Sequence, residues 1–182
     1  LVNYSGVMVD QAEVHVSPDS PYRGAKPDDL KAVSELMRDG LAGRLVRGGY
    51  NVVEAPGPGI LYLRMALTDL SLKKKSRGML AYTPVGAVLK AGRDLVREMM
   101  DKYDILSMTI QGELADSQTG EVIFAFVTVH GDPKGKERID FDELELSMQD
   151  YGSRLRCRLD AAKQAEPERV DCRDPANWPS RD

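Results

Sequence analysis

The residues best suited to catalysis in this sequence are two histidines, His15 and His130. Histidine is the side chain that enzymes use most often to move protons, but it needs a nucleophile and an orienting acid nearby. No motif of the familiar hydrolase, metalloprotease, phosphate-binding or dinucleotide-binding kinds accompanies either histidine. We therefore expect a protein that is not an enzyme, while a small hydrolase with a dispersed active site remains an alternative.

An acidic run, Asp140, Asp142, Glu143 and Glu145, offers oxygen atoms that a metal ion could bind. The same run stands at the start of a helical pattern, where the helix dipole favours negative charge. We interpret the run as the first turn of a helix. We expect neither a metal nor another cofactor in this protein.

The cysteines Cys157 and Cys172 lie 15 residues apart and form no CxxC motif. This spacing does not suit a zinc site or a redox motif, which leaves either two unrelated thiols or a disulfide. A disulfide requires an oxidising compartment. There, closing the loop would stabilise the fold by about 3 kcal/mol and would fold a proline-rich tail back onto the last helix.

The basic residues Lys73, Lys74, Lys75 and Arg77 are predicted to form a loop between a strand and a helix. Such a loop could contact the phosphates of lipid headgroups or an acidic partner, at about 1 kcal/mol per charge near an anionic surface. A solvated loop without a partner explains the same residues. We take these side chains as the candidate binding residues of the sequence.

The segment 116–120, with the sequence DSQTG, could present Asp116 and Thr119 to a ligand. The same residue types build tight turns, because Asp, Ser and Thr bond nearby backbone groups and glycine tolerates a positive φ. Turn chemistry explains every residue of the segment, so we predict the turn of a β-hairpin.

Hydrophobic periodicity places these residues on an ordered set of strands and helices. Over residues 60–72, leucine and methionine alternate with other side chains, as in a strand with one buried face. Apolar residues that recur three or four positions apart indicate amphipathic helices. The expected strands are 4–16, 50–53, 60–72, 105–114 and 121–129, and the expected helices are 28–47, 85–100 and 141–159.

This order of elements predicts an α/β fold, an α+β sandwich in which a mixed sheet of about five strands carries two to three helices. The sheet should be mixed because a hairpin joins antiparallel strands and a helical crossover joins parallel ones. We expect one domain over residues 1–160 and an extended proline-rich tail over residues 161–182.

Composition and charge exclude several classes of protein. The chain has 182 residues, 42% of them hydrophobic, which suffices for a core. A net charge of -4 argues against a nucleic-acid-binding protein. No apolar run is long enough to cross a bilayer. Because the sequence begins with Leu1 and not with methionine, we expect a targeting segment upstream.

Several segments of the sequence resemble one protein family. They are YSGVMVDQAEV, RGGYNVVEAPGPGILYLRMALTDL, TPVG and DSQTGEVIFA. Over residues 4–129 they resemble a bacterial lipoprotein family, domain of unknown function 3313. A looser, fold-level likeness is to periplasmic modules of the curli-secretion-lipoprotein and TolB N-terminal kind. The family resemblance implies an exported protein with a lipidated cysteine upstream of Leu1, and it carries over no catalytic residue.

We therefore expect a non-catalytic domain on the periplasmic side of the bacterial envelope, held at the outer membrane only through that lipid anchor. It would be a binding or assembly module whose partner is an envelope protein, a lipid or a cell-wall component. A structural subunit of an envelope oligomer is the alternative, with a sheet edge or the last helix as its interface.

Overall fold

A computed structural model describes residues 4–75, 92–132, 138–165 and 168–179 of the chain. Its centre is a mixed sheet with the strand order β3-β1-β4-β5-β6, and β2 pairs with β4 beside β1. The parallel pairs are β1–β3, β1–β4 and β2–β4, and the antiparallel pairs are β4–β5 and β5–β6. The strands are β1 (Gly6–Val9), β2 (Glu13–Val16), β3 (Asn51–Val53), β4 (Ile60–Lys74), β5 (Tyr103–Asp116) and β6 (Val122–Gly131).

The expected mixed α/β fold is confirmed, with six strands where about five were predicted. The extra strand arises because the predicted strand over 4–16 is two strands. Both halves run parallel to β4, β1 against its first part and β2 against its middle. Residues 10–12 separate the two strands, and the amide of Asp10 donates to the carbonyl of Leu63.

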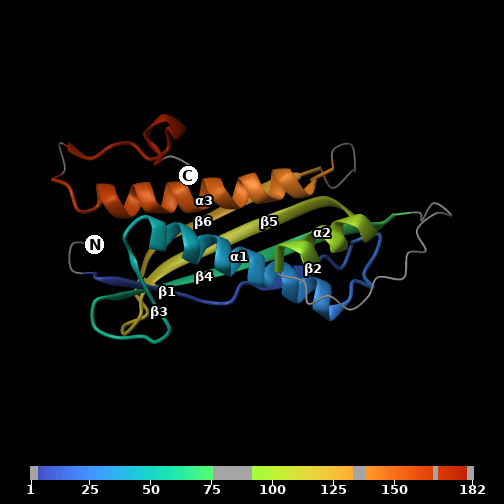
Figure 1. Ribbon diagram of the computed structural model, residues 1–182, viewed down its shortest axis with the longest axis horizontal. Helices are drawn as coiled ribbons and strands as arrows, with labels where there is room; N and C mark the ends of the chain where they lie inside the picture. The colour runs from blue at the N-terminus through green and yellow to red at the C-terminus, as the bar shows by residue number, and fades with distance from the viewer. Residues whose placement is uncertain (1–3, 76–91, 133–137, 166–167, 180–182) are drawn as a thin grey trace.

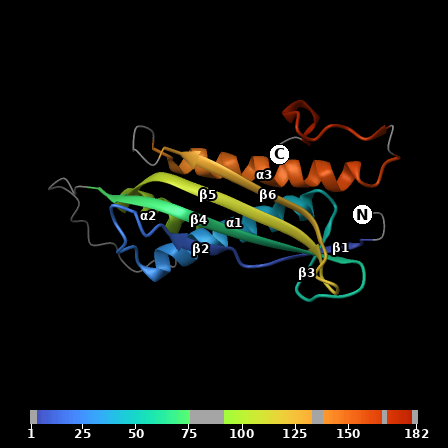
Figure 2. The same cartoon turned by 180° about the vertical axis from the view of Figure 1, so that it is seen from behind.

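The three helices are α1 (Pro27–Arg47), α2 (Gly92–Lys102) and α3 (Phe141–Ala161), and they cover the same face of the sheet (Figures 1 and 2). α1 packs closely against α3 at Gly152, where a Cβ would lie only 2.9 Å from Cγ of Arg44. The predicted second helix, 85–100, lies partly outside the described residues, since α2 is described from Gly92 onward. None of the helices in the described ranges is long and apolar enough to cross a membrane.

β4 shows the predicted alternation only over its first part. Leu61, Leu63, Met65 and Leu67 are buried against the helices, as expected. At Asp69 the backbone adopts a positive φ of 51°, and the pairing with β5 shifts register there. Beyond this irregularity Leu70, Ser71 and Leu72 are buried in succession. A bulge of this kind inserts an extra residue into one strand, so the residues after it change the face of the sheet to which they point. The hydrophobic pattern alone does not show where such a residue is inserted.

The hairpin between β5 and β6 has the predicted turn. One carboxylate oxygen of Asp116 accepts hydrogen bonds from the amides of Gln118 and Thr119 and from the Thr119 hydroxyl. Gly120 has a φ of 72°, which glycine adopts without strain. The hydrogen bonds from Thr119 and Gln118 lower the pKa of Asp116. The side chains of Asp116 and Thr119 therefore stabilise the turn, as predicted for DSQTG.

Candidate functional site

A row of aromatic rings connects the last strand of the sheet with α3. Along β6, Phe124 and Phe126 face the helix layer, and their ring centroids lie 5.9 Å apart. Phe126 stacks in turn on Tyr151 of α3, with the centroids 5.3 Å apart. The hydroxyl of Tyr151 lies 2.7 Å from Nε2 of His130 at the end of the row. Gly112 of β5 leaves room for this row, because a Cβ there would meet the Phe126 ring at 2.4 Å.

Two arginines of α3 lie over this aromatic row. Arg154 and Arg158 stand one helical turn apart, and the Arg158 guanidinium lies 4.2 Å from the centre of the Phe124 ring. Within the part of the chain that the structure describes, neither arginine has an ion-pair partner, whereas Arg156 between them pairs with Asp160. The buried Nε atoms of all three arginines lack a hydrogen-bond partner. Burial, together with the neighbouring charge of Arg154, lowers the pKa of Arg158. Asp171 attracts Arg158 but is already bound by Arg173, so among the described residues neither Arg154 nor Arg158 has a carboxylate of its own.

Next to Arg158, a groove of about 510 Å³ opens between β6, the end of α3 and the C-terminal tail. Its apolar floor includes Ile123, Phe124 and Leu155. Its charged walls carry Arg158, Arg169 and Arg173 against a single carboxylate, that of Asp171. Asp171 is already held by Arg173, whose Nε and Nη2 both donate to it. We call this hollow, together with Arg154, the arginine groove.

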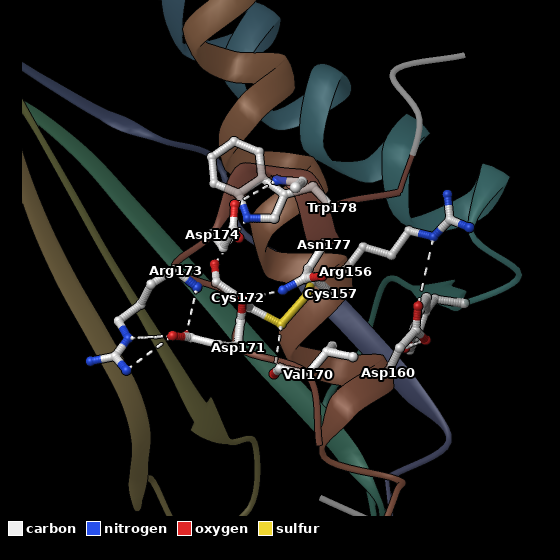
Figure 3. Close-up of a disulfide and its surroundings, with 12 residues drawn as sticks. Arg156, Cys157, Asp160, Val170, Asp171, Cys172, Arg173, Asp174, Asn177 and Trp178 are labelled. Atoms are coloured by element: carbon white, nitrogen blue, oxygen red, sulfur yellow. Dashed lines mark hydrogen bonds and ion pairs between the residues drawn. A yellow bond between two sulfur atoms is a disulfide. The ribbon is translucent and has the colours of Figure 1, made fainter. Parts of the chain in front are cut away.

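The wall formed by the tail is held in place by the disulfide Cys157–Cys172, whose Cα atoms lie 5.8 Å apart. Figure 3 shows the bridge joining α3 to the tail, with Asp171 and Arg173 extending from it. Trp178 packs on the bridged cysteines, and its indole Nε1 donates to the carbonyl of Cys172 at 2.9 Å. The conditionally predicted disulfide is thus present, and the tail turns through a short 3₁₀ helix, η2 (Pro175–Asn177), where an extended segment was expected.

The basic residues chosen from the sequence lie at the opposite end of β4. Lys73 and Lys74 do not belong to a loop, because β4 continues through them and pairs them with Asp104 and Tyr103 of β5. Lys75 donates to the carbonyl of Met100 at 2.6 Å and lies 3.7 Å from Asp104. Arg77 lies outside the described residues. Contact of this basic segment with a membrane or an acidic partner stays a prediction.

Asp104 stands at a second groove, of about 520 Å³, which we call the aspartate groove. The Asp104 side chain is only 9% exposed, and Arg138 approaches its second oxygen at 3.2 Å. Arg97 lies 4.0 Å from Asp142 on the rim of the same groove. In contrast to the arginine groove, the charges here neutralise one another.

The two histidines are not brought together. His15 lies exposed on β2, where its Nε2 is 2.9 Å from a carboxylate oxygen of Glu13. His130 is on β6, and both β4 and β5 lie between β2 and β6 in the sheet. The acidic run behaves as interpreted: Asp140 caps α3 by accepting a hydrogen bond from the amide of Glu143 at 2.8 Å.

Sequence reasoning missed the residues of the arginine groove. The spacing of Arg154 and Arg158, four positions apart on the last helix, places both on one face and was a usable signal. The surroundings of the two arginines could not be predicted from the sequence, because the groove combines β6, α3 and a tail that the disulfide holds against α3.

Comparison with known proteins adds a family and two distant structural likenesses. The model of the family "protein of unknown function (DUF3313)" matches residues 1–139. The fold is similar to a protein described as a neuraminyllactose-binding hemagglutinin homolog from Helicobacter pylori, with 13% identity, coverage of 83% of this chain and 78% of that one, and a TM-score of 0.46. It is also similar to the PelC dodecamer from Paraburkholderia phytofirmans, with 14% identity, coverage of 81% and 83%, and a TM-score of 0.40. No curated protein matches the sequence. Neither structural likeness bears on function.

Proposed function

We propose that this chain, which belongs to the DUF3313 family of proteins of unknown function, is a non-catalytic binding or assembly module that binds an anionic partner in its arginine groove. The observation that carries the proposal is the pair Arg154 and Arg158, which have no carboxylate partner among the described residues. We place the module on the periplasmic side of the bacterial envelope, behind a lipid anchor, with an envelope protein or a lipid or cell-wall component as its partner.

Uncompensated charge at a half-buried position favours a ligand for a simple energetic reason. Burial removes water from a guanidinium group, and only an opposite charge or several hydrogen bonds offset that cost. Arginine presents its donors as a planar fork, which matches the two oxygens of a carboxylate or phosphate. In the aspartate groove the protein supplies such oxygens itself through Asp104. In the arginine groove, the one carboxylate among the described lining residues, that of Asp171, is engaged by Arg173.

The disulfide supports the compartment. Structural disulfides persist in the bacterial periplasm and are rare in the reducing cytosol. The bridge between Cys157 and Cys172 also holds the tail residues that form one wall of the groove, so the groove is complete only where the disulfide can form. Mass spectrometry of the intact protein from a periplasmic extract, without reducing agent, tests this part. Two free thiols there would contradict the proposed location.

Titration calorimetry with poly-glutamate tests anion binding. We expect binding that weakens with salt, and we expect the variant R154Q/R158Q to lose it, because each charge-assisted contact contributes about 1.5–3 kcal/mol. The variant R156Q is the matched control, since it removes one charge from the same helix where Arg156 pairs with Asp160. Equal binding by R154Q/R158Q and the wild type would overturn the proposal.

A further inference from the structure

We propose that the arginine groove and the open edge of β6 together receive an extended acidic segment of a partner protein, which pairs with β6 as an additional strand. The inference rests on the proposed function and deepens it, because it names the class of anionic partner. It depends on three observations: an unpaired strand edge, an unprotected apolar surface on that strand, and positive charge along one side of it.

β6 is the last strand of the sheet on the side away from β1 and β3. Within the described ranges, its residues 122–130 form backbone hydrogen bonds only with β5. Every second residue of such an edge strand directs its N–H and C=O groups away from the sheet. The strand spans ten residues, Val122–Gly131, which is long enough to pair with an incoming segment over several hydrogen bonds.

Natural edge strands are usually protected against pairing by charged side chains, proline or a short length. β6 lacks the first two, because its sequence from Val122 to Val129, VIFAFVTV, contains no charged residue and no proline. Its outward face is also apolar: Val127 and Val129 are each 66% exposed. The neighbouring strands β4 and β5 instead carry the ion pair Arg64–Glu113 on this open face. An apolar, unprotected edge beside a polar face indicates that the edge is used for pairing.

The two sides of an added strand would meet different surroundings, because successive side chains point to opposite faces. On the helix side lie Phe126 and Tyr151, with Arg154 and Arg158 above them. On the open side lie Val127 and Val129. A segment that alternates acidic and apolar residues satisfies both sides: its carboxylates reach the arginines, and its apolar side chains cover the valines.

Charge decides between this partner and a second copy of the chain. If two β6 edges paired with each other, the α3 helices of both copies would face each other across the new pair. Each copy would bring Arg154 and Arg158 to that interface, so four like charges would meet, and Asp171, the described carboxylate that acts on Arg158, is already bound by Arg173. Like-charge contacts of this kind disfavour association, whereas an acidic segment removes the uncompensated charge.

Synthetic peptides of about eight residues, a usual strand length, test the inference on the disulfide-bonded protein. The probe alternates Glu and Val, and the comparison peptides are one in which Lys replaces Glu and one with the same Glu and Val residues in two blocks. We expect the alternating Glu-Val peptide to bind at least about tenfold more tightly than either comparison peptide, as measured by fluorescence anisotropy. The R154Q/R158Q variant should weaken this binding by about tenfold or more, and R156Q should change it by less than about twofold.

Methylated backbone nitrogens distinguish strand pairing from simple charge attraction. In one version of the alternating peptide the Glu nitrogens carry methyl groups, and in the other the Val nitrogens do. Only one of these sets can face β6 in a given register, so we expect one version to lose binding and the other to keep it. Equal binding by both versions, or equal binding by the block peptide, would overturn strand pairing while the anion-binding function stands.

Failure of every acidic peptide, together with failure of poly-glutamate, would overturn the proposed function itself. A concentration-dependent dimer in light scattering that R154Q/R158Q strengthens would identify a second copy as the occupant of the edge, and it would also overturn the inference.

Discussion

The arginine groove and the aspartate groove have almost the same size, about 510 and 520 Å³, and both are lined by charged side chains. They differ in how these charges are balanced. In the aspartate groove one buried carboxylate, Asp104, holds Lys75 and Arg138, and Arg97 meets Asp142. In the arginine groove Arg158 meets an aromatic ring, and the described residues provide it with no carboxylate of its own.

This difference separates a structural use of charge from a use in binding. Paired charges around a buried carboxylate hold the ends of β4, α2 and β5 together. Removing one charge of such a pair leaves the other partly desolvated without a partner, which lowers the stability of the fold. Unpaired cations contribute nothing of this kind to folding. We therefore expect substitutions in the aspartate groove to change stability and substitutions in the arginine groove to change binding.

The largest effect on stability is expected from removing the disulfide, which holds one wall of the arginine groove and has no counterpart in the aspartate groove. The variant C157A/C172A should lower the free energy of unfolding by about 3 kcal/mol, because the unfolded chain gains freedom when the loop is opened. Urea denaturation at neutral pH measures this loss. The same variant should also bind poly-glutamate more weakly. A loss below about 1 kcal/mol would show that the tail holds its position without the bridge.

The next largest effect concerns Asp104 of the aspartate groove. D104N should lower the free energy of unfolding by about 2 kcal/mol, because it leaves Lys75 and Arg138 beside a neutral amide. D101N is the matched control: Asp101 lines the same groove but is exposed, and its substitution should cost less than about 0.5 kcal/mol. Equal unfolding curves for D104N and D101N would contradict the structural role of the buried carboxylate.

A smaller effect is expected from pH, at the aromatic row below the arginine groove. Burial lowers the pKa of His130, so the unfolded chain binds the proton first as the pH falls. The contribution of the neutral His130 ring to the free energy of unfolding is therefore fully present above about pH 6.5, and it is lost as the pH falls through the lowered pKa of the folded state. Urea unfolding at several pH values should show a smaller loss for H130Q than for the wild type. Parallel pH profiles would rule out this contribution.

The smallest effect on stability is expected from Arg158 itself. R158Q removes a half-buried cation but also its contact with the Phe124 ring, and these changes oppose each other. The free energy of unfolding should change by less than about 0.5 kcal/mol, while poly-glutamate binding falls. Thermal denaturation beside calorimetric titration measures both. A loss above about 1.5 kcal/mol would mean that Arg158 supports the fold, as Asp104 does.

Local patterns predicted the parts of the molecule that local chemistry determines. The DSQTG turn followed from its own side chains, and the first part of β4 followed from alternation. The bulge at Asp69 and the division between β1 and β2 depend on how neighbouring strands align, and no single segment records that.

The candidate site was less predictable for the same physical reason. Lys73, Lys74 and Lys75 attracted attention as a run of like charge, but β4 continues through the first two, and Asp104 of the opposing strand forms an ion pair with Lys75. Leu155, Arg156 and Cys157 separate Arg154 from Arg158 in the sequence, and only the fold shows which of these cations lack an ion-pair partner. The family match ends at residue 139, before α3 and the tail. The groove therefore joins a strand within the matched region to a helix and a tail beyond it.

The disulfide has a consequence for when the chain becomes able to bind. Cys172 brings the tail to the end of α3, and the residues beside it form one wall of the groove. A newly made chain with two free thiols would present β6 and the arginines without that wall. Oxidation would then complete the site, and a partner that met the reduced chain would find the groove without its tail wall.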